Sequence, residues 1–180
     1  MIGPLKKSGY TLGRCFLLFP TIERMAVSPN GKIFTPALKY FRWLAPIVVS
    51  ALSLLPDRLK LWLIRSHFDA GTPQCIVTAT QSLLDTFAVS NSLFMANQEM
   101  QQVGELDTEL VKENLDCLSF YYGQTDKWCP KQYYTDIQER FPGGDFHLCE
   151  KGHEHAYVCS TRSNQDLADI VWQWVQPSLK

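Results

Sequence analysis

The stretch CLSFYYGQTDKWCPKQYYTDIQERFPGGDFHLCEKGHEHAY (117–157) decides the fold. It begins with CLSFYYG (117–123), a run of β-forming residues that predicts a buried strand. Pro130 is well placed for the first turn of a helix over 131–141. After a Pro-Gly-Gly turn signal, DFHLCE (145–150) predicts another strand. The stretch therefore predicts strand, helix and strand in succession.

The same pattern continues on both sides of this stretch. Upstream, CFLLF (15–19) is a short apolar run ended by Pro20, which is typical of a strand buried on both faces of a parallel sheet. Downstream, NQDLADIVWQWV (164–175) predicts an amphipathic helix with Asn164 as its N-cap. Strands that alternate with helices form parallel sheets covered by helices. We therefore expect an α/β fold, with residues 116–180 forming its core.

Composition excludes several classes of protein. With 46% hydrophobic and 19% charged residues, the 180-residue chain is typical of one globular domain. A net charge of −1, without clustered Lys and Arg, argues against nucleic-acid binding. The apolar run after the N-terminal segment is too short for a signal peptide, so the six cysteines are expected to be reduced thiols.

The middle of the chain, residues 21–115, is expected to be mostly helical after a turn at Ser28-Pro29-Asn30-Gly31. Its uncharged run 44–55 would span roughly 18 Å as a helix, less than the ~30 Å of a bilayer core. Basic residues flank the run on both sides. The segment from Tyr40 to Arg65 therefore predicts contact with a lipid surface, and the alternative, a buried helical hairpin of a cap domain, stays equally open.

Two titratable residues follow the predicted strands of the tail. Asp126 comes after the strand that ends at Gly123, and His155 comes after the strand over 145–150. In parallel sheets, catalytic groups gather beyond the carboxyl ends of the strands. The order strand, Asp, helix, strand, His is that of the last two members of an α/β-hydrolase triad. On adjacent strands, the Asp126 carboxylate and the His155 ring should lie about 2.6–3.2 Å apart.

Simpler interpretations of these two residues remain open from spacing alone. Asp126 could stabilise its own turn, because Asp is common in turns. His155 could be a surface histidine, and His153 is an equally well-placed candidate.

Longer strings of the sequence resemble one known family. FLLFPTIERM, SPNGKI, NQEM, FYYGQTDKWCPKQYYTDI and FPGGDFHLCEKGHEHAYV are similar to the corresponding stretches of the lipid droplet-associated hydrolase family, from Cys15 to the end of the chain. The resemblance implies an α/β-hydrolase fold with an inserted helical cap over 21–115 and a serine ester hydrolase mechanism. It implies Asp126 as the triad acid and His155, rather than His153, as the general base, with no metal or cofactor.

The resemblance also implies substrates and a location. The expected substrates are neutral-lipid or sterol esters, and the expected location is the cytosolic face of lipid droplets or the endoplasmic reticulum membrane. Within this expectation, residues 40–65 contact the lipid surface.

The sequence departs from the family at the nucleophile. A nucleophile elbow needs G-x-S-x-G, and no serine of the chain has these neighbours. Ser8 comes nearest, but Lys6 and Tyr10 replace the two glycines. In the family the elbow precedes the CFLLF strand. We therefore expect the chain to correspond to the C-terminal portion of the family, with residues 1–20 forming a divergent N-terminus and the first retained core strand, and to be inactive by itself.

Two other functions compete with the hydrolase interpretation. Cys149, His153, His155 and Cys159 could form a metal site, although their spacing matches no common zinc pattern. A non-enzymatic protein that binds a lipid surface through residues 40–65, and keeps the hydrolase tail as a scaffold, would explain the missing serine.

Overall fold

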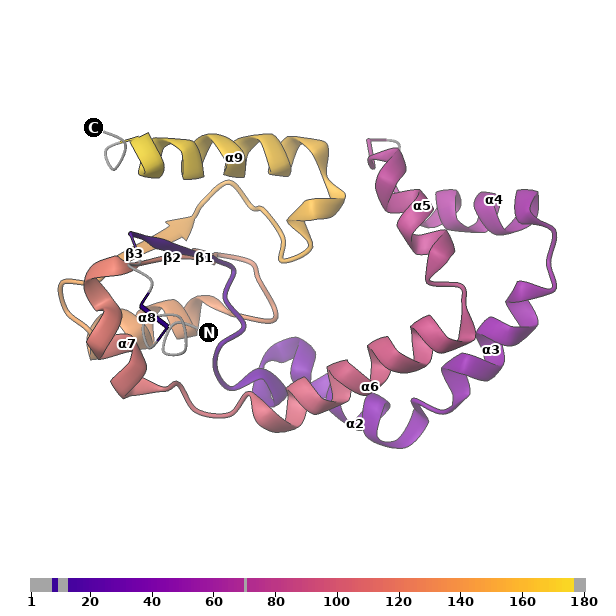
Figure 1. Cartoon of the computed structure of the whole chain (residues 1–180), viewed down its shortest axis with the longest axis horizontal. Coiled ribbons are helices and arrows are strands. Elements are labelled where there is room, and N and C mark those ends of the chain that lie inside the picture. The colour runs from indigo at the N-terminus through magenta and orange to yellow at the C-terminus, as the bar shows by residue number, and fades with distance from the viewer. Residues whose placement is uncertain (1–7, 10–12, 70, 177–180) are drawn as a thin grey trace.

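A three-stranded parallel sheet lies on one side of the computed structural model, which describes residues 8–9, 13–69 and 71–176 (Figure 1). Its strands lie in the order β1 (Cys15–Leu18), β2 (Leu118–Gly123) and β3 (Asp145–Cys149). Leu18 pairs with Tyr121, and Gly123 pairs with Cys149. Because the strands are parallel, their carboxyl ends meet at one edge of the sheet, and the α/β fold predicted from the sequence is confirmed.

Helices fill most of the remaining chain. The α-helices are α2 (Pro29–Phe41), α3 (Leu44–Ser53), α4 (Asp57–His67), α5 (Gln74–Ser82), α6 (Thr86–Gln102), α7 (Thr108–Asn114), α8 (Lys131–Arg140) and α9 (Thr161–Val175). Short 3-10 helices are η1 (Met25–Val27), η2 (Leu115–Cys117) and η3 (Tyr157–Cys159).

Helices α9 and α8 cover opposite faces of the sheet, as expected for an α/β fold (Figure 1). Successive strand residues point to opposite faces, so β2 contributes to both layers. On one face, Trp174 of α9 lies 5.8 Å from the ring of Tyr121 and stacks on Phe16. On the other, Tyr134 of α8 lies 6.0 Å from the ring of Tyr122. Every residue of β2 is buried, which makes this strand the centre of the core.

The strand β1 differs from the expectation that it is buried on both faces. All its residues are only partly buried, because within the described residues β1 pairs with β2 alone and lies at the sheet edge. It ends one residue earlier than the CFLLF pattern suggests. Phe19 has a positive φ of 49°, which an extended strand does not allow, so the chain turns out of the sheet there.

Two helix starts also differ from the sequence predictions. Ser28 and Pro29, predicted to form a turn, begin α2: the Ser28 hydroxyl accepts a hydrogen bond from the Gly31 amide, and Pro29 occupies the first helical position. Asn164 does not cap α9. Ser160 does so, through a 3.3 Å bond from the Ser163 amide to its hydroxyl. Ser and Asn both occur in turns and at helix caps, so the sequence pattern alone does not show which of the two structures such a residue forms.

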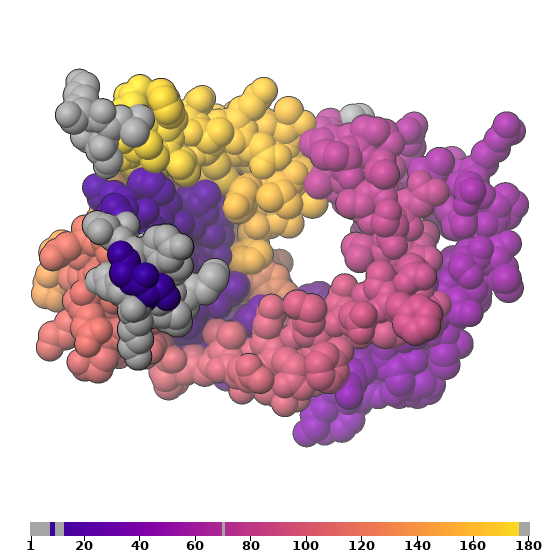
Figure 2. Space-filling model, in the orientation of Figure 1, coloured from indigo at the N-terminus to yellow at the C-terminus, as the bar shows by residue number. Residues whose placement is uncertain are grey.

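Helices α2 to α6 extend to one side of the sheet as a helical arm, defined here as residues 29–102 (Figure 1). In space-filling view an opening lies between the arm, η3 and α9 (Figure 2). Beside this opening the arm reaches α9, where the Thr161 hydroxyl donates to the Gly71 carbonyl at 3.2 Å. The base of the arm contacts the loop that follows β2. There the Asn30 amide donates to the Lys127 carbonyl, and Phe34 stacks on Trp128 at 5.5 Å.

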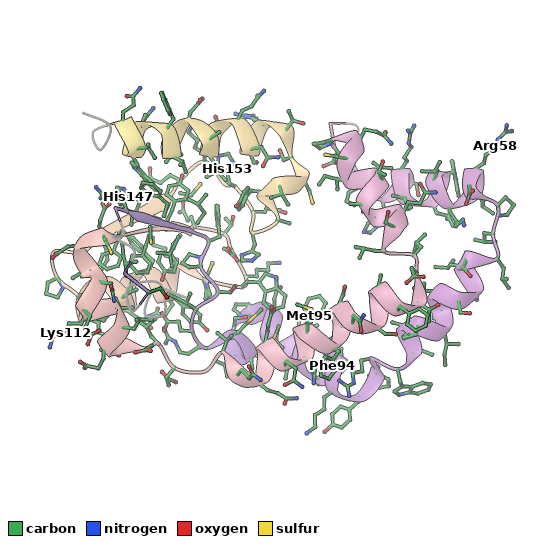
Figure 3. The ribbon with its side chains drawn as sticks, in the orientation of Figure 1. Arg58, Phe94, Met95, Lys112, His147 and His153 are labelled. Carbon is green, nitrogen blue, oxygen red and sulfur yellow. The ribbon has the colours of Figure 1, made fainter. Side chains whose placement is uncertain are left out.

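The arm exposes many large apolar side chains. On α2 to α4 and their connections they are Ile33, Phe34, Tyr40, Phe41, Trp43, Leu44, Ile47, Val48, Leu54, Leu59, Trp62 and Leu63. Arg58 projects from the far end of the arm (Figure 3). None of the helices in the described part of the chain combines the length and apolar character that crossing a bilayer requires.

Candidate active site

Asp126 and His155 meet at the carboxyl edge of the sheet. Each side chain lies in the loop that follows its strand, β2 or β3, and the Gln124 amide ties the loop after β2 to the end of β3 by donating to the Cys149 carbonyl. The Nδ1 atom of His155 lies 2.9 Å from the Asp126 Oδ2 atom. This distance falls within the range predicted from the order of the strands. An acid in this position fixes the tautomer and the orientation of the imidazole.

The Asp126 carboxylate is fully enclosed and saturated with hydrogen bonds. Its side chain has no exposed surface. The Oδ1 atom accepts from the amides of Trp128 at 2.7 Å and Cys129 at 3.2 Å, which closes the turn after β2. Burial alone would raise the pKa of Asp126, but hydrogen bonds from His155, Cys129 and the Trp128 amide hold it below its usual value. The carboxylate is therefore ionised at neutral pH.

Cys129 is a third member of this cluster that the sequence analysis missed. Its buried thiol donates to Asp126 Oδ2 at 2.9 Å, and the sulfur lies 3.9 Å from His155 Nδ1. Burial and the adjacent carboxylate raise the pKa of the Cys129 thiol far above its usual value, so the sulfur keeps its proton. A cysteine three residues after a candidate acid, within one turn, was the available signal.

An aromatic layer supports the imidazole from the side of β1. Phe19 is buried, and its ring centre lies 6.5 Å from that of His155 and 5.4 Å from that of Tyr157. The turn at Phe19 brings this ring over Gly123, where an added Cβ would lie 2.8 Å from Phe19 Cε1 and 3.0 Å from Asp126 Cβ. Only glycine therefore lets Phe19 and Asp126 pack this closely.

A cavity opens in front of His155. It has a volume of about 370 Å³ and is lined by Asn30, Thr125, Lys127, Trp128, Glu154, His155 and Ala156. The side chain of His155 is 34% exposed, in contrast to the enclosed Asp126. The imidazole therefore lies between a carboxylate that is shielded from solvent and an accessible cavity. A base that exchanges protons with a bound molecule requires this position.

The structure does not assemble the other residues considered from the sequence. His153 lies beneath α9, with its Nε2 atom 3.3 Å from Asp166 Oδ2, so it does not pair with Asp126 (Figure 3). The group Cys149, His153, His155 and Cys159 is not among the potential metal clusters of the described residues. Spacing suggested this group, but the four ligand atoms do not all lie within 4.8 Å of one another.

The candidate nucleophile by position, Ser8, lies in an exposed turn with Gly9. Lys6 and Tyr10, which replace the two glycines of an elbow, lie outside the described residues.

Comparison with known proteins identifies the family. The family model described as "Lipid-droplet associated hydrolase" matches residues 5–158. The chain belongs to the lipid droplet-associated hydrolase family. It is 44% identical over 161 residues to the lipid droplet-associated hydrolase of Homo sapiens, covering 88% of this chain and 48% of the relative. The Gallus gallus protein of the same name is 42% identical over 169 residues, covering 92% and 51%.

More distant members match over the same extent. The lipid droplet-associated hydrolase of Drosophila melanogaster is 36% identical over 165 residues, covering 91% of this chain and 53% of the relative. The chain therefore spans about half the length of these members of the family. No solved structure matches it.

Proposed function

We propose that this chain carries the acid and the general base of a serine ester hydrolase that acts on neutral-lipid or sterol esters. The observation that carries the proposal is the 2.9 Å contact between Asp126 Oδ2 and His155 Nδ1 at the carboxyl ends of neighbouring parallel strands. Membership of a family named for hydrolase activity supports it. The aromatic and aliphatic side chains of residues 21–115, proposed as the cap, favour an apolar acyl or sterol group over a charged one.

The geometry supports a different role for each of the two residues, Asp126 and His155. With Nδ1 donating its proton to Asp126, the Nε2 atom of His155 holds a lone pair that can accept the proton of an attacking serine. His155 then carries a positive charge, which the adjacent carboxylate stabilises. Still in the first half of the reaction, the ester C–O bond breaks and His155 gives the proton to the leaving alcohol, which leaves the acyl-enzyme. In the second half, water attacks the acyl-enzyme and gives a proton to His155, which returns it to the serine as the acid is released. This scheme uses no metal and no organic cofactor.

The nucleophile is proposed to come from sequence outside these 180 residues, because none of their serines has the G-x-S-x-G pattern. The chain by itself is then inactive. Loss of a triad nucleophile costs several orders of magnitude in rate.

A fluorophosphonate probe, which reacts with activated serines, tests this proposal. We expect no labelling of the 180-residue chain and stoichiometric labelling of a full-length family member. In that member, alanine at the histidine aligned with His155 should abolish labelling, because the serine loses its base. Stoichiometric labelling of the short chain, lost in the His155→Ala variant, would contradict the proposal and indicate a substitute nucleophile, with Ser8 the first to test.

A second proposed property is binding to the cytosolic surface of lipid droplets or the endoplasmic reticulum through residues 40–65. Large side chains such as Trp43, Ile47, Leu54 and Trp62 are exposed there, and contiguous exposed apolar surface marks interaction sites. Basic residues at both ends suit a segment that lies in a lipid interface. If binding to lipid were the whole function, the His155→Ala variant would leave the biological role of the protein unchanged.

A further inference from the structure

Three side chains of different chemistry converge at the sheet edge. Among the described residues, Asp126, Cys129 and His155 form a group in which one ligand atom of each lies within 4.8 Å of the others. The separations are 2.9 Å from Asp126 Oδ2 to Cys129 Sγ, 2.9 Å from the same oxygen to His155 Nδ1, and 3.9 Å from Sγ to Nδ1. Oxygen, sulfur and imidazole nitrogen are the ligands that zinc binds in proteins.

We propose that Asp126, Cys129 and His155 bind a zinc ion, and that zinc bound there blocks the acid–base pair. Usual zinc bond lengths in a tetrahedron separate ligand atoms by roughly 3.4–3.6 Å. The contacts to Asp126 must lengthen by about 0.5–0.7 Å and the contact between Cys129 and His155 must shorten by about 0.3–0.5 Å. Of the side chains in the pair, His155 is 34% exposed and Asp126 is fully enclosed, so His155 has more room to move.

The charges and protons of the bound state balance. Cys129 gives up its thiol proton to solvent and binds through the thiolate. The His155 proton moves from Nδ1 to Nε2, so that the neutral imidazole binds through its Nδ1 lone pair. One proton therefore leaves for each Zn²⁺ that enters. The charge of the ion is cancelled by one carboxylate and one thiolate, so no unpaired charge is buried beside the enclosed Asp126.

The cavity in front of His155 supplies the route and the remaining ligand. His155 is the exposed member of the group, and it lines the cavity of about 370 Å³. Asp126 and Cys129 do not line the cavity, so an ion that enters from it must pass the His155 ring to reach them. In this proposal water completes a tetrahedron whose other three positions come from protein.

Zinc at this position is incompatible with the proposed reaction. With zinc on Nδ1 and a proton on Nε2, His155 has no lone pair left to accept the proton of a serine. Asp126, bound to the metal, no longer orients the ring. This consequence rests on the proposed hydrolase function, whereas binding of zinc does not.

The first test measures metal binding to the purified 180-residue chain. Zn²⁺ titrated against a chromophoric chelator should bind with a stoichiometry of one, releasing one proton per ion in weakly buffered solution. Co²⁺ in place of Zn²⁺ should give a sulfur-to-cobalt charge-transfer band and the strong visible absorption of a tetrahedral site. A chain that binds no ion, or binds Co²⁺ without the sulfur band, overturns the proposal.

Matched variants identify the sulfur ligand. Cys129→Ser keeps a hydroxyl that can donate to Asp126 but removes the thiolate. It should abolish the sulfur band and weaken zinc binding by more than the roughly 10–100-fold that loss of an outer-shell partner costs. Cys159→Ser should bind zinc unchanged. If Cys159→Ser loses the band while Cys129→Ser keeps it, the metal lies elsewhere and the proposed site is wrong.

The block is tested on a full-length family member with a cysteine aligned with Cys129. Saturating zinc should abolish its fluorophosphonate labelling, and a chelator should restore it. Labelling that persists in zinc-saturated protein overturns the block and leaves the hydrolase proposal intact. Absence of labelling even in metal-free protein contradicts the hydrolase proposal, while the cobalt spectrum still decides the binding of metal.

Discussion

Replacing Gly123 by alanine tests the packing that brings the aromatic layer against the acid. The added Cβ would lie 2.8 Å from Phe19 Cε1, 3.0 Å from Asp126 Cβ and 3.1 Å from Phe19 Cδ1. Unstrained carbon contacts lie at about 3.5–4.0 Å, so the neighbours must retreat by roughly 0.5–1 Å. Phe19 has little room to do so, because it is 3% exposed and packs against Tyr121 and Tyr157.

The expected cost follows from this overpacking. Extra atoms in a packed core cost about 1–3 kcal/mol of unfolding free energy. With an m-value of about 2 kcal/mol per M of urea, the midpoint of unfolding should fall by roughly 0.5–1.5 M. Gly104→Ala is the matched control. A Cβ at that position meets no atom within 4 Å, so its effect should stay within about 0.5 kcal/mol.

A double variant isolates the contact itself. Phe19→Leu makes room for the Cβ of Gly123→Ala, so the combined loss should be smaller than the sum of the single losses by more than about 0.5 kcal/mol. Additive losses would mean that the ring of Phe19 does not press on position 123, and the close packing deduced from the structure would be refuted.

Two further predictions concern the acid and the arm. Because the pKa of Asp126 is lowered by folding, its ionised form stabilises the protein above the unfolded pKa of about 3.9, and this contribution is lost as the pH falls through the folded pKa. Asp126→Asn should lower the free energy of unfolding by about 2–5 kcal/mol at pH 7, since the donors of His155 and Cys129 lose their acceptor. The urea midpoint of this variant should vary less between pH 5 and pH 3 than that of the parent protein. Equal pH profiles would contradict this prediction. In the arm, Ile47→Asp with Leu54→Asp should release a fluorescent fusion from lipid droplets, because a charge within hydrocarbon costs about 2.5–3.5 kcal/mol per residue. Val158→Asp, which changes an exposed apolar position outside the arm, should not release it. Retention of the double variant on droplets would mean that the arm does not contact lipid.

The pairing of Asp126 with His155 could be predicted from the sequence because it depends on topology alone. Parallel neighbouring strands end at one edge, so the loops after 117–123 and 145–150 had to meet there. The contact of Cys129 could not be predicted in this way. It depends on the turn in which the amides of residues 128 and 129 bind Asp126, and turn conformation is not encoded in strand order.

Local sequence patterns predicted the helices and strands, but not always the residues at which they begin and end or how they are arranged. The short segment 15–19 does carry a strand, yet its final residue, Phe19, leaves the sheet in a left-handed conformation that nothing in its side chain favours. Ser28 and Asn164 belong to residue types that suit turns and helix caps alike, so tertiary context decided between them. The stretch 44–55 could lie in a core or in lipid by pattern alone, and its side chains are largely exposed because the arm extends away from the sheet.

The Asp126 carboxylate holds its own loop with one oxygen and the imidazole with the other. A substitution at Asp126 therefore disrupts both the proposed acid–base pair and the turn after β2, so a null phenotype from it does not identify a catalytic defect. The hydrogen bonds that close the turn after β2 run from the amides of Trp128 and Cys129 to Asp126 and do not involve the His155 side chain. For anyone interpreting variants in this family, loss of the histidine with the protein still abundant is the informative result, whereas loss of the aspartate must first be separated from a fall in protein level.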